Sequence, residues 1–215
     1  MSRPAAAVHH VVKAYDVRGL VGEEIDESLA VDCGAAFARL MRDEGARRVT
    51  IGYDMRDSSP SLAAAFATGV TAQGLDVVRI GLSSTDQLYF ASGLLECPGA
   101  MFTASHNPAA YNGIKLCRAG AKPVGADTGL TTISDDIIAG VACHEGSAGT
   151  VTDKDVLAEY GDFLRSLVDT SGLRPLRVAV DAGNGMAGHT APAVLGAIDS
   201  LTLLPLYFEL DGTFP

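Results

Sequence analysis

A serine on a turn is the feature of this sequence that most directly suggests chemistry. Ser105 stands in Thr103-Ala104-Ser105-His106-Asn107-Pro108, immediately after an apolar stretch. Because Asn-Pro favours a turn, the serine side chain is expected at a sheet edge and not in the core. A serine presented in this way can act as a nucleophile when a base or a cation activates it, and His106 and Lys115 are the local candidates. The alternative is a polar hairpin whose side chains only satisfy backbone groups.

A second polar cluster lies near the start of the chain, in Lys13-Ala14-Tyr15-Asp16-Val17-Arg18-Gly19. Arg18 supplies a permanently charged, fork-shaped donor that suits phosphate or carboxylate oxygens. Tyr15 beside it can orient a substrate hydroxyl. The alternative is a solvent-exposed turn with Gly19 at positive φ.

A third cluster, Asp54-Met55-Arg56-Asp57-Ser58-Ser59-Pro60, ends an expected strand and opens an expected helix. Backbone N–H groups at a helix start attract anions, so the cluster is a candidate anion site. Simple capping of the helix, with Ser59 as the N-cap and Pro60 in the first turn, explains the same residues equally well.

A glycine-rich turn follows much later, at Gly183-Asn184-Gly185-Met186-Ala187-Gly188. It fits G-x-G-x-x-G between a strand and a helix, which is the context of a dinucleotide-binding fingerprint. The acidic residue expected about 20 positions later has Asp199 or Glu209 as candidates, and neither falls cleanly at a strand end. A tight turn that needs glycine for close packing is the alternative.

The elements that must position these residues alternate between helix and strand. Helix-strand-helix-strand order implies β-α-β units and a parallel sheet. The sequence therefore predicts an α/β fold, with a mixed, largely parallel sheet flanked by helices. The expected helices are 28–44, 59–73 and 85–91, and the expected strands are 49–53, 75–80, 99–103 and 113–117, the last two enclosing the loop 104–112.

A Gly/Ser stretch at 146–149 is the candidate domain boundary. Helical patterns at 127–138 and 153–168 flank it, and Asp153-Lys154-Asp155 is interpreted as the start of the second helix. We expect a first domain over 1–151 and the beginning of a second, similar α/β domain over 152–215. A single strand-helix-strand unit cannot cover both faces of its own sheet, so this second domain is expected to be incomplete.

Composition argues against several classes of partner. The 215 residues carry 16 Lys and Arg against 26 Asp and Glu, a net charge of −10, which repels nucleic acid and anionic lipid surfaces. The sequence has neither a signal peptide nor a run of about 18 apolar residues. Four cysteines without a C-x-x-C pair are interpreted as reduced thiols of a cytoplasmic protein.

Taken together and in this order, the clusters resemble the α-D-phosphohexomutase family, most closely its bacterial phosphomannomutase/phosphoglucomutase branch. The resemblance runs over essentially the whole chain, and the serine loop is its most specific part. The matching segments are 13–19, 52–58, 103–108 with 111–115, 180–185 and 211–215.

The resemblance implies an isomerase that interconverts hexose 6-phosphate and hexose 1-phosphate, with mannose, glucose or both as the sugar. Ser105 would carry a phosphoryl group, donate it to the sugar phosphate and recover it from a hexose 1,6-bisphosphate intermediate. Arg18 and Lys115 would lie near the transferred group, and the phosphoserine would be one ligand of Mg²⁺. The glycine turn at 183–188 would then belong to the second domain and need hold no nucleotide.

The sequence also departs from the family pattern. The metal loop Asp-Gly-Asp-x-Asp-Arg, the sugar-reading loop and the C-terminal phosphate-binding domain have no counterpart up to residue 215, and Asp211-Gly212 lacks the second aspartate of the metal loop. We therefore expect this chain to be part of a longer enzyme and to be inactive alone.

Overall fold

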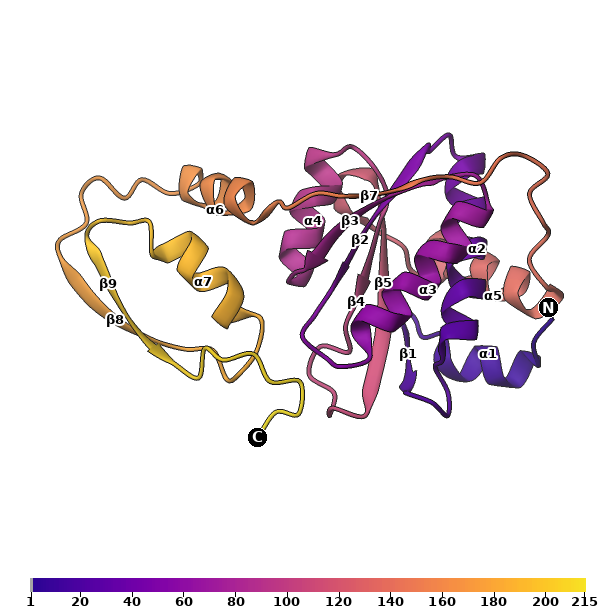
Figure 1. Cartoon of the computed structure of the whole chain (residues 1–215), viewed down its shortest axis with the longest axis horizontal. Coiled ribbons are helices and arrows are strands. Elements are labelled where there is room, and N and C mark those ends of the chain that lie inside the picture. Colours follow the sequence, from indigo (N-terminus) through magenta and orange to yellow (C-terminus); the bar gives the residue numbers. More distant parts are fainter. Residues whose placement is uncertain (1) are drawn as a thin grey trace.

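Two sheets organise the computed structural model, which describes residues 2–215 (Figure 1). The seven-stranded sheet has the order β1-β5-β4-β2-β3-β7, with β6 paired to β5, and the small sheet pairs β8 with β9. The strands are β1 Val17–Leu20, β2 Arg48–Tyr53, β3 Asp76–Leu82, β4 Gly99–Phe102, β5 Tyr111–Arg118, β6 Lys122–Pro123, β7 Val151–Asp153, β8 Leu176–Asp181 and β9 Leu201–Leu206.

The larger sheet is mixed, as predicted. Its consecutive strands β4, β2, β3 and β7 run parallel, whereas β5 is antiparallel to both of its neighbours β4 and β1. The carboxyl ends of β2 and β4 therefore lie at the same edge of the sheet. The segments that follow these two strands are the third cluster and the serine loop.

Helices cover both faces of this sheet (Figure 1). Phe37 of α2 (Glu27–Asp43), Phe66 of α3 (Ser59–Ala72) and Phe102 of β4 pack together in the main core. The ring centroids of Phe66 and Phe102 lie 5.5 Å apart. The helices are α1 Ala5–Val11, α2 Glu27–Asp43, α3 Ser59–Ala72, α4 Thr85–Leu94, α5 Leu130–Ala139, α6 Leu157–Ser166 and α7 Ala187–Leu195, with short 3₁₀ turns at Ala119–Ala121 and Ala126–Thr128. None of the helices within residues 2–215 is both long and apolar enough to cross a membrane.

The prediction that Asp153 begins a helix is wrong. Val151–Asp153 forms strand β7, which pairs in parallel with β3, and helix α6 begins only at Leu157. A long-range ion pair accompanies this strand pairing: both carboxylate oxygens of Asp153 accept from the guanidinium of Arg79, at 2.7 and 2.8 Å. Residues 151–153 thus belong to the first sheet.

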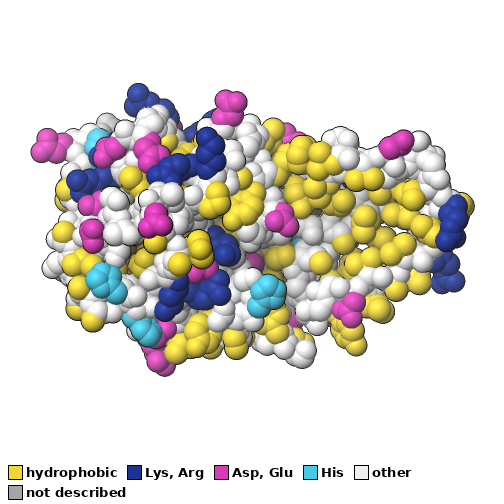
Figure 2. All heavy atoms as spheres, turned by 180° about the vertical axis from the view of Figure 1, so that it is seen from behind, with side chains coloured by type: hydrophobic (Ala, Val, Ile, Leu, Met, Phe, Trp, Pro, Cys, Tyr) yellow, Lys and Arg dark blue, Asp and Glu magenta, His cyan; other side chains and the backbone are white. Residues whose placement is uncertain are grey.

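The strand-helix-strand unit predicted near the end of the chain is present as β8, α7 and β9, with the two strands in parallel. None of residues 162–215 is buried. Figure 2 shows hydrophobic side chains gathered on this part of the molecule, where Leu167, Val168 and Tyr207 are exposed. The division into domains at 151 stays a prediction.

Candidate active site

The serine loop follows the carboxyl end of β4, directly after this strand as the sequence predicts. The Ser105 side chain is exposed, and its Oγ lies 2.9 Å from Nδ1 of His106. Its backbone N–H donates to Oγ1 of Thr103 at 3.0 Å. Ser105 has a φ of 54°, the left-handed region that is costly for a residue with a side chain. Such strain is concentrated at functional sites, because the surrounding structure must hold it.

Arg18 and Lys115 come together on neighbouring strands, β1 and β5. The carboxylate of Asp16, which is 7% exposed, accepts hydrogen bonds from both of them: Oδ2 accepts from a terminal nitrogen of Arg18 and from Nζ of Lys115 at 3.3 Å. The other terminal nitrogen of Arg18 donates to Oδ1 of Asn107 at 2.7 Å. One buried carboxylate therefore holds two cations beside the serine loop.

The sequence analysis missed Asp16, although it stands inside the cluster that contains Arg18. Tyr15 is 78% exposed and lies outside this group of charges. Its role in substrate binding stays a prediction, as does the role of His106 as a base. Gly19, expected at positive φ if the cluster were only an exposed turn, instead belongs to strand β1.

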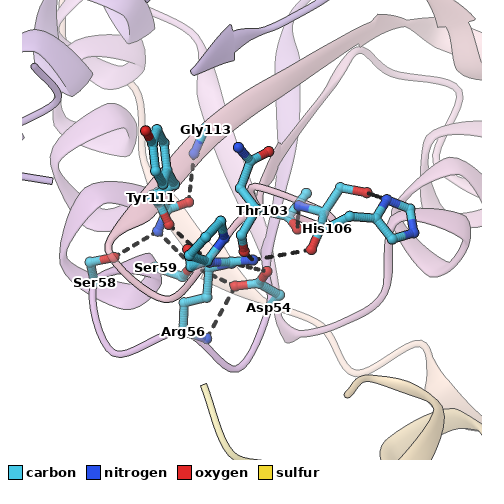
Figure 3. Close-up of polar contacts among 12 residues, drawn as sticks. Asp54, Arg56, Ser58, Ser59, Thr103, His106, Tyr111 and Gly113 are labelled. Atoms are coloured by element: carbon cyan, nitrogen blue, oxygen red, sulfur yellow. Dashed lines mark hydrogen bonds and ion pairs between the residues drawn. The ribbon is translucent and has the colours of Figure 1, made fainter. Parts of the chain in front are cut away.

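The third cluster contains a residue that the sequence analysis did not single out, the buried Arg56. Its Nε donates to Oδ2 of Asp54 at 3.2 Å. Its two terminal nitrogens donate to four backbone carbonyls of the serine loop and the start of β5, as Figure 3 shows in part. The four acceptors are Ser105, Asn107, Pro108 and Tyr111.

A buried hydrogen-bond network joins the third cluster to the serine loop's return strand (Figure 3). Asn112 donates from Nδ2 to the hydroxyls of Ser58 and Ser59, at 2.8 and 2.9 Å, and Ser59 donates to Asp54 at 2.7 Å. Ser59 is therefore not the helix cap that the sequence suggested; Ser58 occupies that position, without a capping bond from its side chain. Hydrogen bonds from the third cluster thus hold the serine loop and its return strand in place.

The glycine turn at 183–188 is explained by close packing. A Cβ at Gly188 would lie 2.2 Å from the carbonyl oxygen of Phe208, and Gly183 has a φ of 52°. The close approach at Gly188 requires glycine and the positive φ at Gly183 favours it, without any nucleotide. The dinucleotide-binding alternative is therefore not favoured.

Three of the four cysteines are too buried to be candidate nucleophiles. All four thiols are free, and three of them are buried. Burial raises the pKa of Cys33 to about 12 and that of Cys97 to about 11, so both stay protonated near neutral pH. Since the thiolate is the reactive form, these buried thiols are inert.

We predict that Asp16→Asn destabilises the chain, because it removes the negative charge that pairs with both Arg18 and Lys115 and offsets their mutual repulsion. Hydrogen bonds to charged groups contribute about 1.5–3 kcal/mol, so we expect a loss of that order in the free energy of unfolding. Urea denaturation of the 215-residue chain measures it. The control is Asp135→Asn, at an exposed position on α5, and an equal change in both variants would contradict the role given to Asp16.

The fold and the site define a class: an α/β domain whose sheet edge presents a strained serine backed by an arginine and a lysine. Residues 9–140 match the family model for the α/β/α domain I of phosphoglucomutase/phosphomannomutase. The chain belongs to the phosphoglucomutase/phosphomannomutase family.

Curated relatives agree with this assignment. The chain is 39% identical over 204 residues to a protein of Xanthomonas campestris named phosphohexose mutases, a match that covers 94% of this chain and 45% of that protein. It is 39% identical over 213 residues to a phosphomannomutase of Escherichia coli, covering 94% of this chain and 46% of the relative. The chain thus spans slightly less than half the length of these relatives.

Solved structures share the fold. A crystal structure of a phosphoglucomutase/phosphomannomutase family protein from Burkholderia thailandensis superposes with a TM-score of 0.87 at 32% identity, over 100% of this chain and 46% of the other. A putative phosphomannomutase from Thermus thermophilus superposes with a TM-score of 0.79 at 24% identity, over 100% of this chain and 48% of the other, and shows the fold alone.

Proposed function

We propose that the protein to which this chain belongs interconverts hexose 6-phosphate and hexose 1-phosphate, with mannose or glucose as the sugar. Membership of the family and the names of its relatives support this activity. The observation that carries the proposal is local: an exposed serine in a strained conformation lies in a loop that Arg18 contacts, and Lys115 shares a carboxylate with that arginine.

In the proposed reaction, Ser105 carries a phosphoryl group. A sugar hydroxyl attacks the phosphorus, so that one O–P bond forms while the bond to Oγ of Ser105 breaks. The product is a hexose 1,6-bisphosphate, and transfer of its other phosphoryl group back to Ser105 releases the isomerised monophosphate. No phosphate is gained or lost over the cycle.

Positive charge is what such a transfer most needs from the protein, because negative charge is spread over the transferred group in the transition state. Arg18 and Lys115 would supply it. His106, whose Nδ1 lies 2.9 Å from Oγ of Ser105, is our candidate to give Oγ a proton when the phosphoryl group leaves and to take that proton back when Ser105 is phosphorylated again. The proton of the attacking sugar hydroxyl passes to a base on the opposite side of the phosphorus, because the attacking and leaving oxygens lie in line.

We also propose Mg²⁺ as the cofactor, with a phosphoserine oxygen at Ser105 as one ligand. Mg²⁺ takes oxygen ligands, commonly one or two carboxylates. Within residues 2–215, however, no three His, Cys, Asp or Glu side chains cluster in a way that could hold a metal. The only carboxylate described beside the serine loop's cations, Asp16, is already engaged by both of them. The described residues of this chain therefore do not by themselves supply a site for the ion.

A coupled assay of the whole protein tests the proposal. Mannose 1-phosphate and glucose 1-phosphate are each supplied with a catalytic amount of the corresponding 1,6-bisphosphate, and formation of the 6-phosphate is followed. We expect turnover of at least one of the two sugars. No turnover of either would contradict the proposed activity.

A further inference from the structure

Arg56 makes an unusually complete set of contacts for a buried arginine. The residue is 2% exposed. One terminal nitrogen donates to the carbonyls of Pro108 and Tyr111, at 2.9 and 3.0 Å. The other donates to the carbonyls of Ser105 and Asn107, at 3.1 and 2.8 Å. The planar fork of the guanidinium therefore fixes four points along one loop.

These bonds bear directly on the conformation of the reacting serine. The carbonyl of Ser105 is itself an acceptor, so rotation of that residue out of its left-handed conformation would break a charge-assisted hydrogen bond. A strained residue persists only where the surroundings over-determine it, and Arg56 supplies that constraint. The side chain of Ser105 is left free to face solvent.

The outer face of the same guanidinium is covered by the end of the chain. The Phe214 ring centroid lies 4.9 Å from Cζ of Arg56, the geometry of a cation–π contact. Gly212 packs closely as well, since a Cβ there would lie 2.9 Å from the carbonyl oxygen of Met55 and 3.0 Å from Cα of Arg56. The segment 211–215 therefore packs against Met55 and Arg56.

Hydrogen bonds attach this segment to the glycine turn at 183–188. The backbone N–H of Asp211 donates to the carbonyl of Asn184 at 3.0 Å, and the Asp211 side chain accepts from Thr213. Asn184 donates in turn to the carbonyl of Glu209 at 2.9 Å. Figure 1 shows the chain end running from β9 toward the larger sheet. A continuous set of contacts thus leads from the glycine turn at 183–188 to the serine loop.

We propose that Arg56 is a positioning residue that holds Ser105 in its reactive conformation, and that Phe214 stabilises Arg56 in this role. Docking of the 211–215 segment and the order of the serine loop are then coupled. The coupling itself is a property of the chain, whereas its meaning for catalysis rests on the proposed function.

The ring of Phe214 is the part of this device that can be changed without touching the buried network. In Phe214→Tyr the aromatic face is kept, in Phe214→Leu apolar volume is kept without a π face, and in Phe214→Ala both are lost. Hydrogen exchange of the Ser105 and Asn107 amides, measured on the 215-residue chain, reports the order of the loop.

We expect the Ala and Leu variants to exchange these amides faster than the parent, on the order of 5-fold, as befits the loss of a partly desolvated cation–π contact. The Tyr variant should exchange at the parental rate. The amides of β7, at the far edge of the sheet, serve as an internal control and should not change. A parental exchange rate in the Tyr variant together with faster exchange in the Leu variant would show that the aromatic face matters, because both side chains fill the apolar space.

Either of two results would overturn the proposal. Equal exchange in Leu and Tyr variants would show that the ring face contributes nothing. Parental exchange in the Ala variant would show that the loop is ordered independently of Phe214.

Arg56→Lys provides a second measurement. Lysine keeps the charge but cannot reach four carbonyls with a planar fork, so loop exchange should rise while β7 stays protected. Arg79→Lys, which alters an exposed ion pair with Asp153, is the matched control and should leave the serine loop unchanged. If Arg56→Lys does not fold, the Phe214 series decides.

The inference and the proposed function can fail separately. Suppose that the Phe214 variants change exchange in the serine loop but the whole protein shows no mutase turnover. This result would contradict the proposed function and leave the coupling in place. Turnover without coupling would contradict only the inference. If both hold, Phe214→Leu in the whole protein should lower kcat more than it changes KM, because the loop acts on the reacting group and not on substrate binding.

Discussion

Replacing Ser105 by alanine is expected to abolish mutase turnover, with a loss of at least about 10⁴-fold in kcat, because the residue that carries the phosphoryl group is removed. The change should leave folding intact. The serine side chain is exposed, and substitutions at such positions usually alter stability by no more than about 0.5 kcal/mol. The coupled assay and a thermal melt of the same preparation measure the two effects.

The matched control for this variant is Ser147→Ala, at an exposed serine of the stretch that joins α5 to β7. It should retain full activity. If Ser105→Ala turned over hexose phosphate as fast as the control, Ser105 would not be the phosphoryl carrier, whatever its conformation.

Alanine at Arg18 or at Lys115 should lower kcat/KM on the order of 10²-fold or more, as expected when charge that stabilises the transferred group is lost. Each single variant should keep a melting temperature close to the parent's, because the other cation still pairs with Asp16. The double variant should melt lower, since it leaves a buried carboxylate without either partner. Steady-state kinetics and thermal melts of the three variants test these expectations.

Lys122→Ala serves as the control for lost positive charge, because Lys122 is exposed on the short strand β6. Parental activity in either Arg18→Ala or Lys115→Ala would remove that residue from the site. A large fall in melting temperature in a single variant would instead give the residue a structural role, contrary to the shared-carboxylate geometry.

Local patterns were enough to predict strands β2 to β5 of the larger sheet and the loop that carries Ser105, but not strands β1, β6 and β7. Apolar spacing, for example, predicts a helix over 28–44, and α2 spans Glu27–Asp43. Its N-cap is Asp26, which was not predicted and whose side chain accepts from the backbone N–H of Leu29. The resemblance to a family then singled out Ser105, Arg18 and Lys115.

What the sequence could not predict depends on contacts between distant residues. Arg56 reads locally as part of a helix start, yet its acceptors lie 49 to 55 positions away along the chain. Asp153 reads as a helix start as well, yet it lies in strand β7, which pairs with β3, and its ion-pair partner Arg79 stands 74 positions earlier. Asp16 binds a second cation besides its neighbour Arg18, and that cation, Lys115, lies 99 positions away. Propensity and spacing contain no information about such pairs.

The central claim is that Ser105 accepts and donates the phosphoryl group, and the most direct test is to locate that group. The whole protein is incubated with mannose or glucose 1,6-bisphosphate, digested, and its phosphopeptides are sequenced by mass spectrometry. The account predicts phosphate on Ser105, discharged again when the hexose monophosphate is added in excess. Phosphate found only on another residue, or a phosphate on Ser105 that the monophosphate does not remove, would contradict it.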